Sequence, residues 1–132
     1  MSWRNCHLAI GGIGLLLFVL QGQYMARVLG VDAMSDGPRM LYRSAHIYFL
    51  LSCVANVSIG YFMSGTQVLN ALQRLVAIAV MVAPALLLWS FFTESTNSTL
   101  LRMISKAGLY LLFGSAVLMV LQDIYQRFAN RA

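Results

Sequence analysis

Long apolar runs dominate the chain, and polar segments interrupt them at three places. The runs cover residues 7–26, 45–64, 68–92 and 103–122. Each is close to the ~20 residues that an α-helix needs to cross the ~30 Å hydrocarbon layer of a bilayer. The runs are long and nearly unbroken, whereas a helix on a soluble protein carries polar residues at every turn. We therefore predict an all-α, polytopic membrane protein, with four transmembrane helices in an up-down bundle and a single domain spanning residues 1–132.

The composition supports lipid rather than water as the solvent. The chain is 60% hydrophobic and 10% charged, whereas a soluble domain carries about 25% charged residues. Its net charge is +5, which in a membrane protein is typical of arginines at the headgroup level. No basic stripe with interleaved aromatic residues is present, so nucleic acid is not an expected partner. The lipid bilayer is the expected surrounding.

The positive charges do not fix the orientation in the membrane. Four spans place both termini on one side, and the positive-inside rule compares the cations on the two sides. One side carries Arg4, Arg74, Arg127 and Arg131, and the other carries Arg27, Arg39, Arg43, Arg102 and Lys106. Four cations against five leave the orientation open.

Small and polar residues form a stripe along the second span. Tyr48, Ser52, Asn56, Gly60 and Ser64 recur every four residues and therefore share one face of a helix. In membranes, small residues let helices approach closely and polar residues bond across the interface. We expect this stripe to pack against another helix, with the lining of a pore or pocket as the alternative. An amide at the depth of Asn56 needs a hydrogen-bond partner.

A second cluster gathers at one membrane face. Arg39, Arg43 and His46 are spaced i, i+4, i+7 at the start of the second span, near a helix N-terminus that favours anions. Arg27, at the end of the first span, and Lys106, near the start of the fourth, reach the same face. We expect these five residues either to bind a phosphate, a carboxylate or a lipid headgroup, or to anchor helix ends at the interface.

Cofactor ligands are sparse. His7 and His46 open the first and second spans, so they lie at opposite membrane faces and cannot share one haem. Haem held by one histidine, or by His46 with Met25, stays open but is not expected. Cys6 and Cys53 form no CxxC pair and no zinc spacing, so no metal site is expected. In the third span, Pro84 removes a backbone donor and should loosen the helix.

Three segments of the polar region resemble a known family. Arg27-Val28-Leu29-Gly30-Val31, Asp36-Gly37 and Arg43-Ser44-Ala45-His46 are similar to the membrane glutathione transferases, which are small four-helix membrane enzymes. The resemblance implies glutathione binding at the arginine-rich start of the second helix. After His46 the chain continues Ile47-Tyr48-Phe49, where that family has an Asn and a Glu.

Three functions follow from these patterns. We expect a non-enzymatic membrane protein that acts as a homo-oligomer or as an accessory subunit among other membrane subunits, because the second span carries a packing stripe and no acidic residue lies within a predicted span. The first alternative is an enzyme of lipophilic substrates with an anionic co-substrate at Arg39, Arg43 and His46. The second is a small transporter or channel with a water-lined path along the stripe.

Overall fold

The computed structural model describes residues 2–64, 69–95 and 102–129. Within them the chain forms α1 (Trp3–Arg27), α2 (Asp36–Phe62), α3 (Ala71–Glu94) and α4 (Met103–Ala129), with a short 3-10 helix η1 (Val31–Ala33) between the first two. All four long helices are long and apolar enough to cross a membrane. The prediction of an all-α membrane protein with four spanning helices is confirmed.

Helix ends differ from the predicted span ends, because a helix continues into the polar interface after its apolar run stops. α1 begins at Trp3, α2 begins at Asp36 and α4 continues to Ala129. α3 begins later than predicted, at Ala71, because Asn70 caps it: the Asn70 side chain accepts from the Gln73 backbone N–H at 2.8 Å. Such a reciprocal cap fixes a helix start.

One member of the stripe falls outside its helix. α2 ends at Phe62, and Met63 already has an extended backbone. Ser64 therefore lies beyond the helix and is exposed, so placing it on the same helical face was wrong. The hydropathy of the run extends past the point where the backbone leaves the helical conformation.

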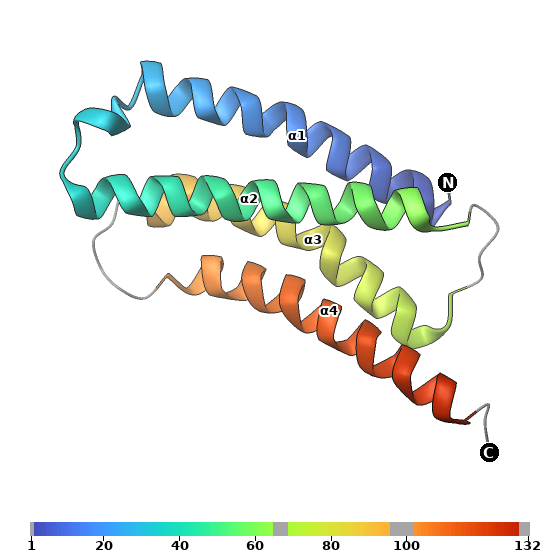
Figure 1. Cartoon of the computed structure of the whole chain (residues 1–132). Helices are drawn as coiled ribbons and strands as arrows, with labels where there is room; N and C mark the ends of the chain where they lie inside the picture. The colour runs from blue at the N-terminus through green and yellow to red at the C-terminus, as the bar shows by residue number, and fades with distance from the viewer. Residues whose placement is uncertain (1, 65–68, 96–101, 130–132) are drawn as a thin grey trace.

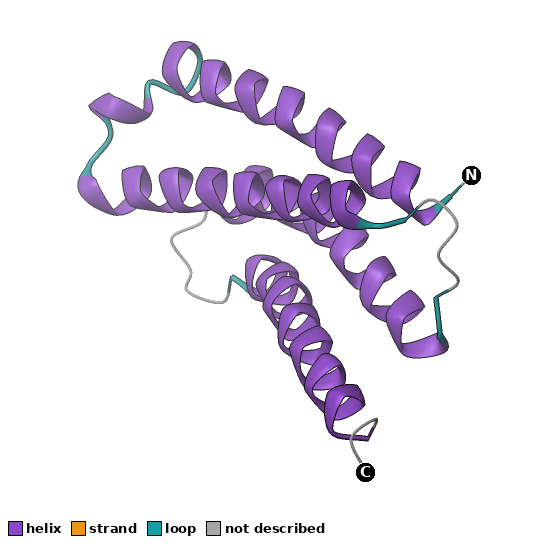
Figure 2. Ribbon diagram, turned by 45° about the vertical axis from the view of Figure 1, so that its right-hand side comes forward, coloured by secondary structure: helices purple, strands orange, loops and turns teal. Residues whose placement is uncertain are grey.

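The helices run up and down, but the fourth leaves the bundle. Figure 1 shows α1 beside α2, with α3 behind α2, and the start of α1 and the end of α4 at the same end of the molecule. α4 packs almost wholly against α3, and within the described residues it makes no contact with α1. Figure 2 shows α4 diverging from the other three helices. Buried side chains therefore lie among α1, α2 and α3 and also between α3 and α4, where Leu112 packs with Val80 and Ala83.

Glycines bring α1 and α2 into backbone contact. A Cβ added at Gly60 of α2 would lie 2.8 Å from Leu8 Cγ and 2.9 Å from the Leu8 backbone nitrogen. A Cβ added at Gly11 of α1 would lie 2.7 Å from the Val57 backbone nitrogen. Lipid supplies no hydrophobic drive for association between membrane helices, so close packing at small residues such as these stabilises the helix pair instead.

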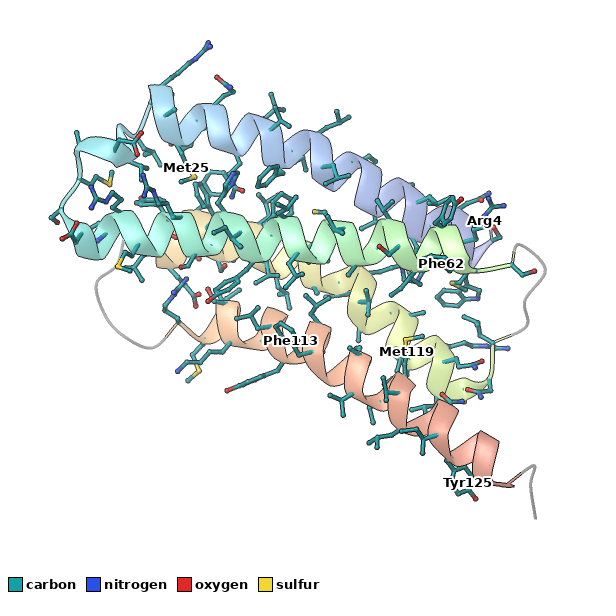
Figure 3. The ribbon with its side chains drawn as sticks, viewed as in Figure 1. Arg4, Met25, Phe62, Phe113, Met119 and Tyr125 are labelled. Atoms are coloured by element: carbon teal, nitrogen blue, oxygen red, sulfur yellow. The ribbon has the colours of Figure 1, made fainter. Side chains whose placement is uncertain are left out.

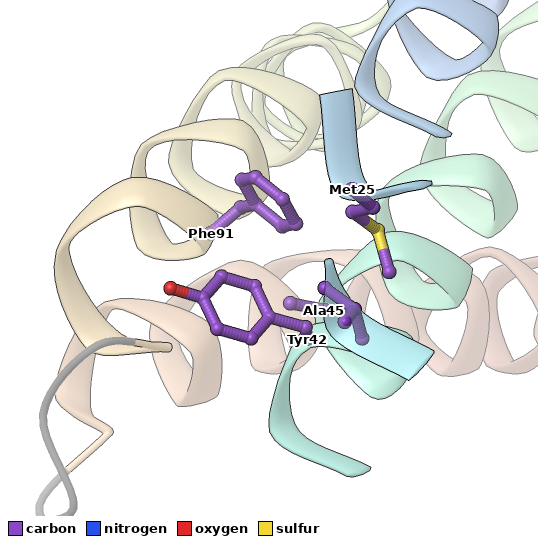
Figure 4. Close-up of a cluster of buried hydrophobic side chains, with 5 residues drawn as sticks. Met25, Tyr42, Ala45 and Phe91 are labelled. Carbon is purple, nitrogen blue, oxygen red and sulfur yellow. The ribbon is translucent and has the colours of Figure 1, made fainter. Parts of the chain in front are cut away.

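A cluster of buried apolar residues closes the end of the bundle where α2 begins. It contains Met25, Val31, Tyr42, Ala45 and Phe91, and Figure 4 shows four of them converging from α1, α2 and α3. The Tyr42 and Phe91 rings meet edge to face with centroids 5.4 Å apart. This cluster holds η1 against the helices and so places the polar residues around it.

Candidate functional site

Asn56 is the centre of the buried polar network. It is fully buried, and its Nδ2 donates to the carbonyl oxygens of Ser52 and Val80, each at 2.9 Å. Its Oδ1 lies 2.8 Å from Nδ1 of His7. Because the amide nitrogen faces two carbonyls, the amide oxygen faces His7, and His7 Nδ1 is the donor. This single side chain links α1, α2 and α3.

The bond to Val80 has a specific cause. In a regular α-helix the carbonyl of residue 80 accepts from the N–H of residue 84, but Pro84 has no N–H. The Asn56 Nδ2 donates to this carbonyl at 2.9 Å. An unsatisfied carbonyl within the hydrocarbon layer costs several kcal/mol. α2 therefore supplies the donor that Pro84 removes from α3.

The other helical members of the stripe also lie between helices. Ser52 is fully buried, and its hydroxyl donates to the Phe49 carbonyl at 2.7 Å. Gly60 is buried against α1. Tyr48 is half-buried and packs on the apolar cluster around Phe49. Apart from Ser64, the stripe faces protein.

His7, which the sequence suggested only as a haem ligand, belongs to the network around Asn56. Its side chain is 0% exposed, and its Nε2 has no hydrogen-bond partner among the described residues. The only sequence signal was a polar residue near the start of the first span. Because the imidazole is enclosed, a porphyrin cannot reach Nε2 without separation of the helices, so His7 does not fit a haem ligand.

A second histidine–amide pair lies toward the other end of the α1–α2 interface. His46 Nδ1 lies 2.8 Å from Gln21 Oε1, and the imidazole stacks on Phe18 with ring centroids 4.0 Å apart. His46 and Met25 border one surface hollow of about 250 Å³. The structure thus brings together the two side chains that we weighed as a haem pair, although His46 already has a hydrogen-bonded and stacked position.

The two arginines at the start of α2 have carboxylate partners. Arg43 Nη2 donates to Asp32 Oδ1 at 2.7 Å, and Arg39 forms an ion pair with Asp36. The carboxylates are 81% and 83% exposed, and such surface pairs contribute little to stability. An anion at this face would compete with them for the guanidinium groups.

Arg27 and Lys106 do not join the arginines in one pocket. Arg27 lies in the last turn of α1 and is exposed, and Lys106 is exposed on α4. Because α1 and α4 do not touch within the described residues, the five predicted anion-binding residues share one end of the molecule without forming one cluster.

Glu94 joins α3 to α4, a link that we did not predict. The Glu94 carboxylate accepts from the Ile104 N–H at 2.6 Å, the Ser105 N–H at 2.9 Å and the Ser105 hydroxyl at 2.6 Å. A carboxylate in this position caps a helix N-terminus. Arg102 lies within 3.5 Å of the Ser44 hydroxyl of α2 and of the Ser105 hydroxyl of α4. Its buried Nε has no partner among the described residues.

An apolar groove separates α2 from the outer part of α4. It measures about 380 Å³, and its lining includes Ala55, Ile59, Val80, Leu112, Ala116 and Met119. Residues 116–125 of α4 are exposed or half-buried wherever their side chains are described. Figure 3 shows Met119 and Tyr125 on this diverging stretch.

Comparison with known proteins gave no match among protein families, curated proteins or solved structures.

Proposed function

We propose that this chain is a non-enzymatic membrane subunit that works by associating with other transmembrane helices, either of further copies or of another membrane protein. The observation that carries the proposal is the apolar groove between α2 and α4. It exists because α4 packs against α3 and hardly touches α2. A four-helix chain with this arrangement offers a concave surface at a depth where only lipid or another helix can lie.

The shape of the groove favours a helix over a lipid chain. Between helices in a bilayer, association depends on close packing rather than on a hydrophobic drive. The lining combines the small Ala55 and Ala116 with the larger Ile59 and Met119. The small residues leave depressions into which side chains of another helix can pack. A flexible acyl chain loses conformational freedom when it fills a groove, whereas a helix is already rigid.

The polar groups inside the bundle support a packing role over a transport role. Asn56 makes three hydrogen bonds to protein groups, and the Ser52 hydroxyl bonds within its own helix. A water-lined path along the stripe would have to break these bonds.

Mass measurement in mild detergent tests the proposal. We expect native mass spectrometry to give either multiples of 14.6 kDa or one chain with a second subunit. Ala116→Trp fills the groove and should abolish the complex. Ala107→Trp is the matched control, because Ala107 is exposed on the same helix and points about half a turn away.

Other outcomes would contradict the proposal. A result in which the unmodified protein and both variants are all single chains, without any partner, would remove its basis. Glutathione binding that is detected by calorimetry and lost in Arg43→Ala would favour the enzyme. Ion or solute flux into liposomes that is lost in Asn56→Leu would favour the transporter or channel.

A further inference from the structure

A second hollow lies at the end of the bundle where α2 begins, away from the apolar groove, and its mostly apolar lining carries a few polar groups. It measures about 600 Å³, and its lining includes Met34, Ser35, Gly37, Leu41, Tyr42 and Ser95. These residues belong to the start of α2, the segment before it and the end of α3. The hollow therefore lies at the level of the helix ends, where a bilayer has its headgroups.

The start of α2 provides unbonded backbone donors. Ser35 is the N-cap residue, but its side chain forms no capping hydrogen bond. The N–H groups of Asp36 and Gly37 have no acceptor among the described residues, as the first turn of a helix requires. A Cβ at Gly37 would meet nothing within 4 Å, so the space beside this residue is open. The helix dipole favours an anion at this position.

A buried hydroxyl provides an independent indication of a ligand. Ser95 is 3% exposed, and its Oγ has no hydrogen-bond partner in the part of the chain that the structure describes. Ser95 lines the same hollow from the end of α3. Burying a hydroxyl without a partner is costly, and buried polar atoms nearly always have one. A ligand with oxygen acceptors in the hollow would satisfy it.

The charge balance at this end of the bundle favours an anion. Among the described residues there, the five cations outnumber the three carboxylates by two, although none of the cations lines the hollow itself; they are Arg27, Arg39, Arg43, Arg102 and Lys106, against Asp32, Asp36 and Glu94. All three carboxylates already accept hydrogen bonds from protein donors. Arg102 Nη1 donates to the Ser44 hydroxyl at 3.5 Å, and that hydroxyl donates to the carbonyl of Leu41, a lining residue.

We propose that this hollow binds a phosphate group. The oxygens of a phosphate accept from several donors at once, which matches the N–H groups of Asp36 and Gly37 and the hydroxyl of Ser95. A phospholipid headgroup or free inorganic phosphate would supply this group. The proposal does not depend on helix association at the groove.

Native mass spectrometry with added phosphatidylglycerol tests the site in the full-length protein. Ser95→Ala removes the buried hydroxyl, and Gly37→Leu places a side chain in the hollow while raising helix propensity. We expect each variant to lose about tenfold or more in lipid affinity, the usual effect of one hydrogen bond to a charged group. Gly12→Leu is the matched control, because its Cβ also meets nothing within 4 Å but lies on α1, which contributes no residue to the lining of the hollow.

Inorganic phosphate separates the two sources. Phosphate that raises the unfolding temperature of the unmodified protein but not of Gly37→Leu would support the site and assign it to free phosphate. Lipid binding without a phosphate effect would support the site and assign it to a headgroup. The proposal would be overturned if Ser95→Ala and Gly37→Leu bound phosphatidylglycerol and phosphate as tightly as the Gly12→Leu control does. Should Gly37→Leu fail to fold, Ser95→Ala decides alone.

Discussion

Asn56→Leu should be the most damaging conservative change within the bundle. Leucine is close to asparagine in shape, so the helices should stay at the same distance and the cavity cost should be small. Two groups on other helices would lose their partner, the Val80 carbonyl and the His7 Nδ1–H. Both lie in the part of the protein that water does not reach, since His7 is 0% and Asn56 0% exposed.

The expected cost follows from these two groups. Interhelical hydrogen bonds in membranes contribute about 0.6 kcal/mol each on average, which sets a lower limit near 1 kcal/mol for the pair. A buried group left without a partner costs about 1–3 kcal/mol, which sets an upper limit near 6 kcal/mol. We expect a loss of about 2–4 kcal/mol, because the His7 ring can rotate toward another acceptor, whereas the Val80 carbonyl loses the side-chain donor that replaces the N–H missing at Pro84.

Reversible unfolding in mixed micelles, followed by far-UV circular dichroism, measures this loss. Ser52→Ala is the control, because its hydroxyl bonds within α2, and it should cost less than about 1 kcal/mol. Pro84→Ala restores an N–H for the Val80 carbonyl. In that background Asn56→Leu should cost about 1–2 kcal/mol less than in the unmodified chain.

Two results would refute this reasoning. The first is a cost below about 0.5 kcal/mol for Asn56→Leu. The second is an equal cost of Asn56→Leu in the unmodified chain and in the Pro84→Ala background, which would mean that the amide does not replace the missing backbone donor.

Three further predictions concern the contacts between elements. Gly60→Ala should destabilise the protein by roughly 1–3 kcal/mol in the same unfolding assay, because its Cβ would lie within 3 Å of the facing helix. Gly12→Ala, which has open space around it, should be neutral or slightly stabilising. Equal effects of the two substitutions on stability would contradict the close packing at Gly60. Glu94→Ala should cost about 1–2 kcal/mol and raise amide hydrogen exchange in the first turn of α4, which its carboxylate caps; unchanged exchange there would exclude the cap. Asp32→Ala should change stability by less than about 1 kcal/mol, because its bond to Arg43 is exposed; a larger loss would show that this pair holds η1 in place.

Hydropathy predicted the spans because lipid is a uniform solvent for long apolar runs. It did not predict where the helices end, since ends depend on caps and on polar residues that remain helical outside the hydrocarbon. Asn70 delays the start of α3, and the extended backbone at Met63 removes Ser64 from α2. Both are local hydrogen-bonding effects that an average over twenty residues cannot detect.

The polar network was predictable in kind but not in its partners. Asn56 needed a partner on chemical grounds, and Pro84 was expected to loosen its helix. Their connection depends on the relative heights of two helices, which no single span encodes. Likewise, Arg43 and Asp32 are both visible in the sequence, but their pairing requires the chain to turn at Gly30, whose φ of 58° is left-handed.

The bond from Asn56 to Val80 also has a consequence for the synthesis of the protein. A ribosome delivers α2 to the membrane before α3, because α2 comes first in the chain. The donor that the Val80 carbonyl needs is therefore already in the bilayer when the proline-containing helix arrives. α3 can enter lipid against a neighbour that completes its backbone, and the order of the two helices along the chain limits the time during which that carbonyl stands alone in hydrocarbon.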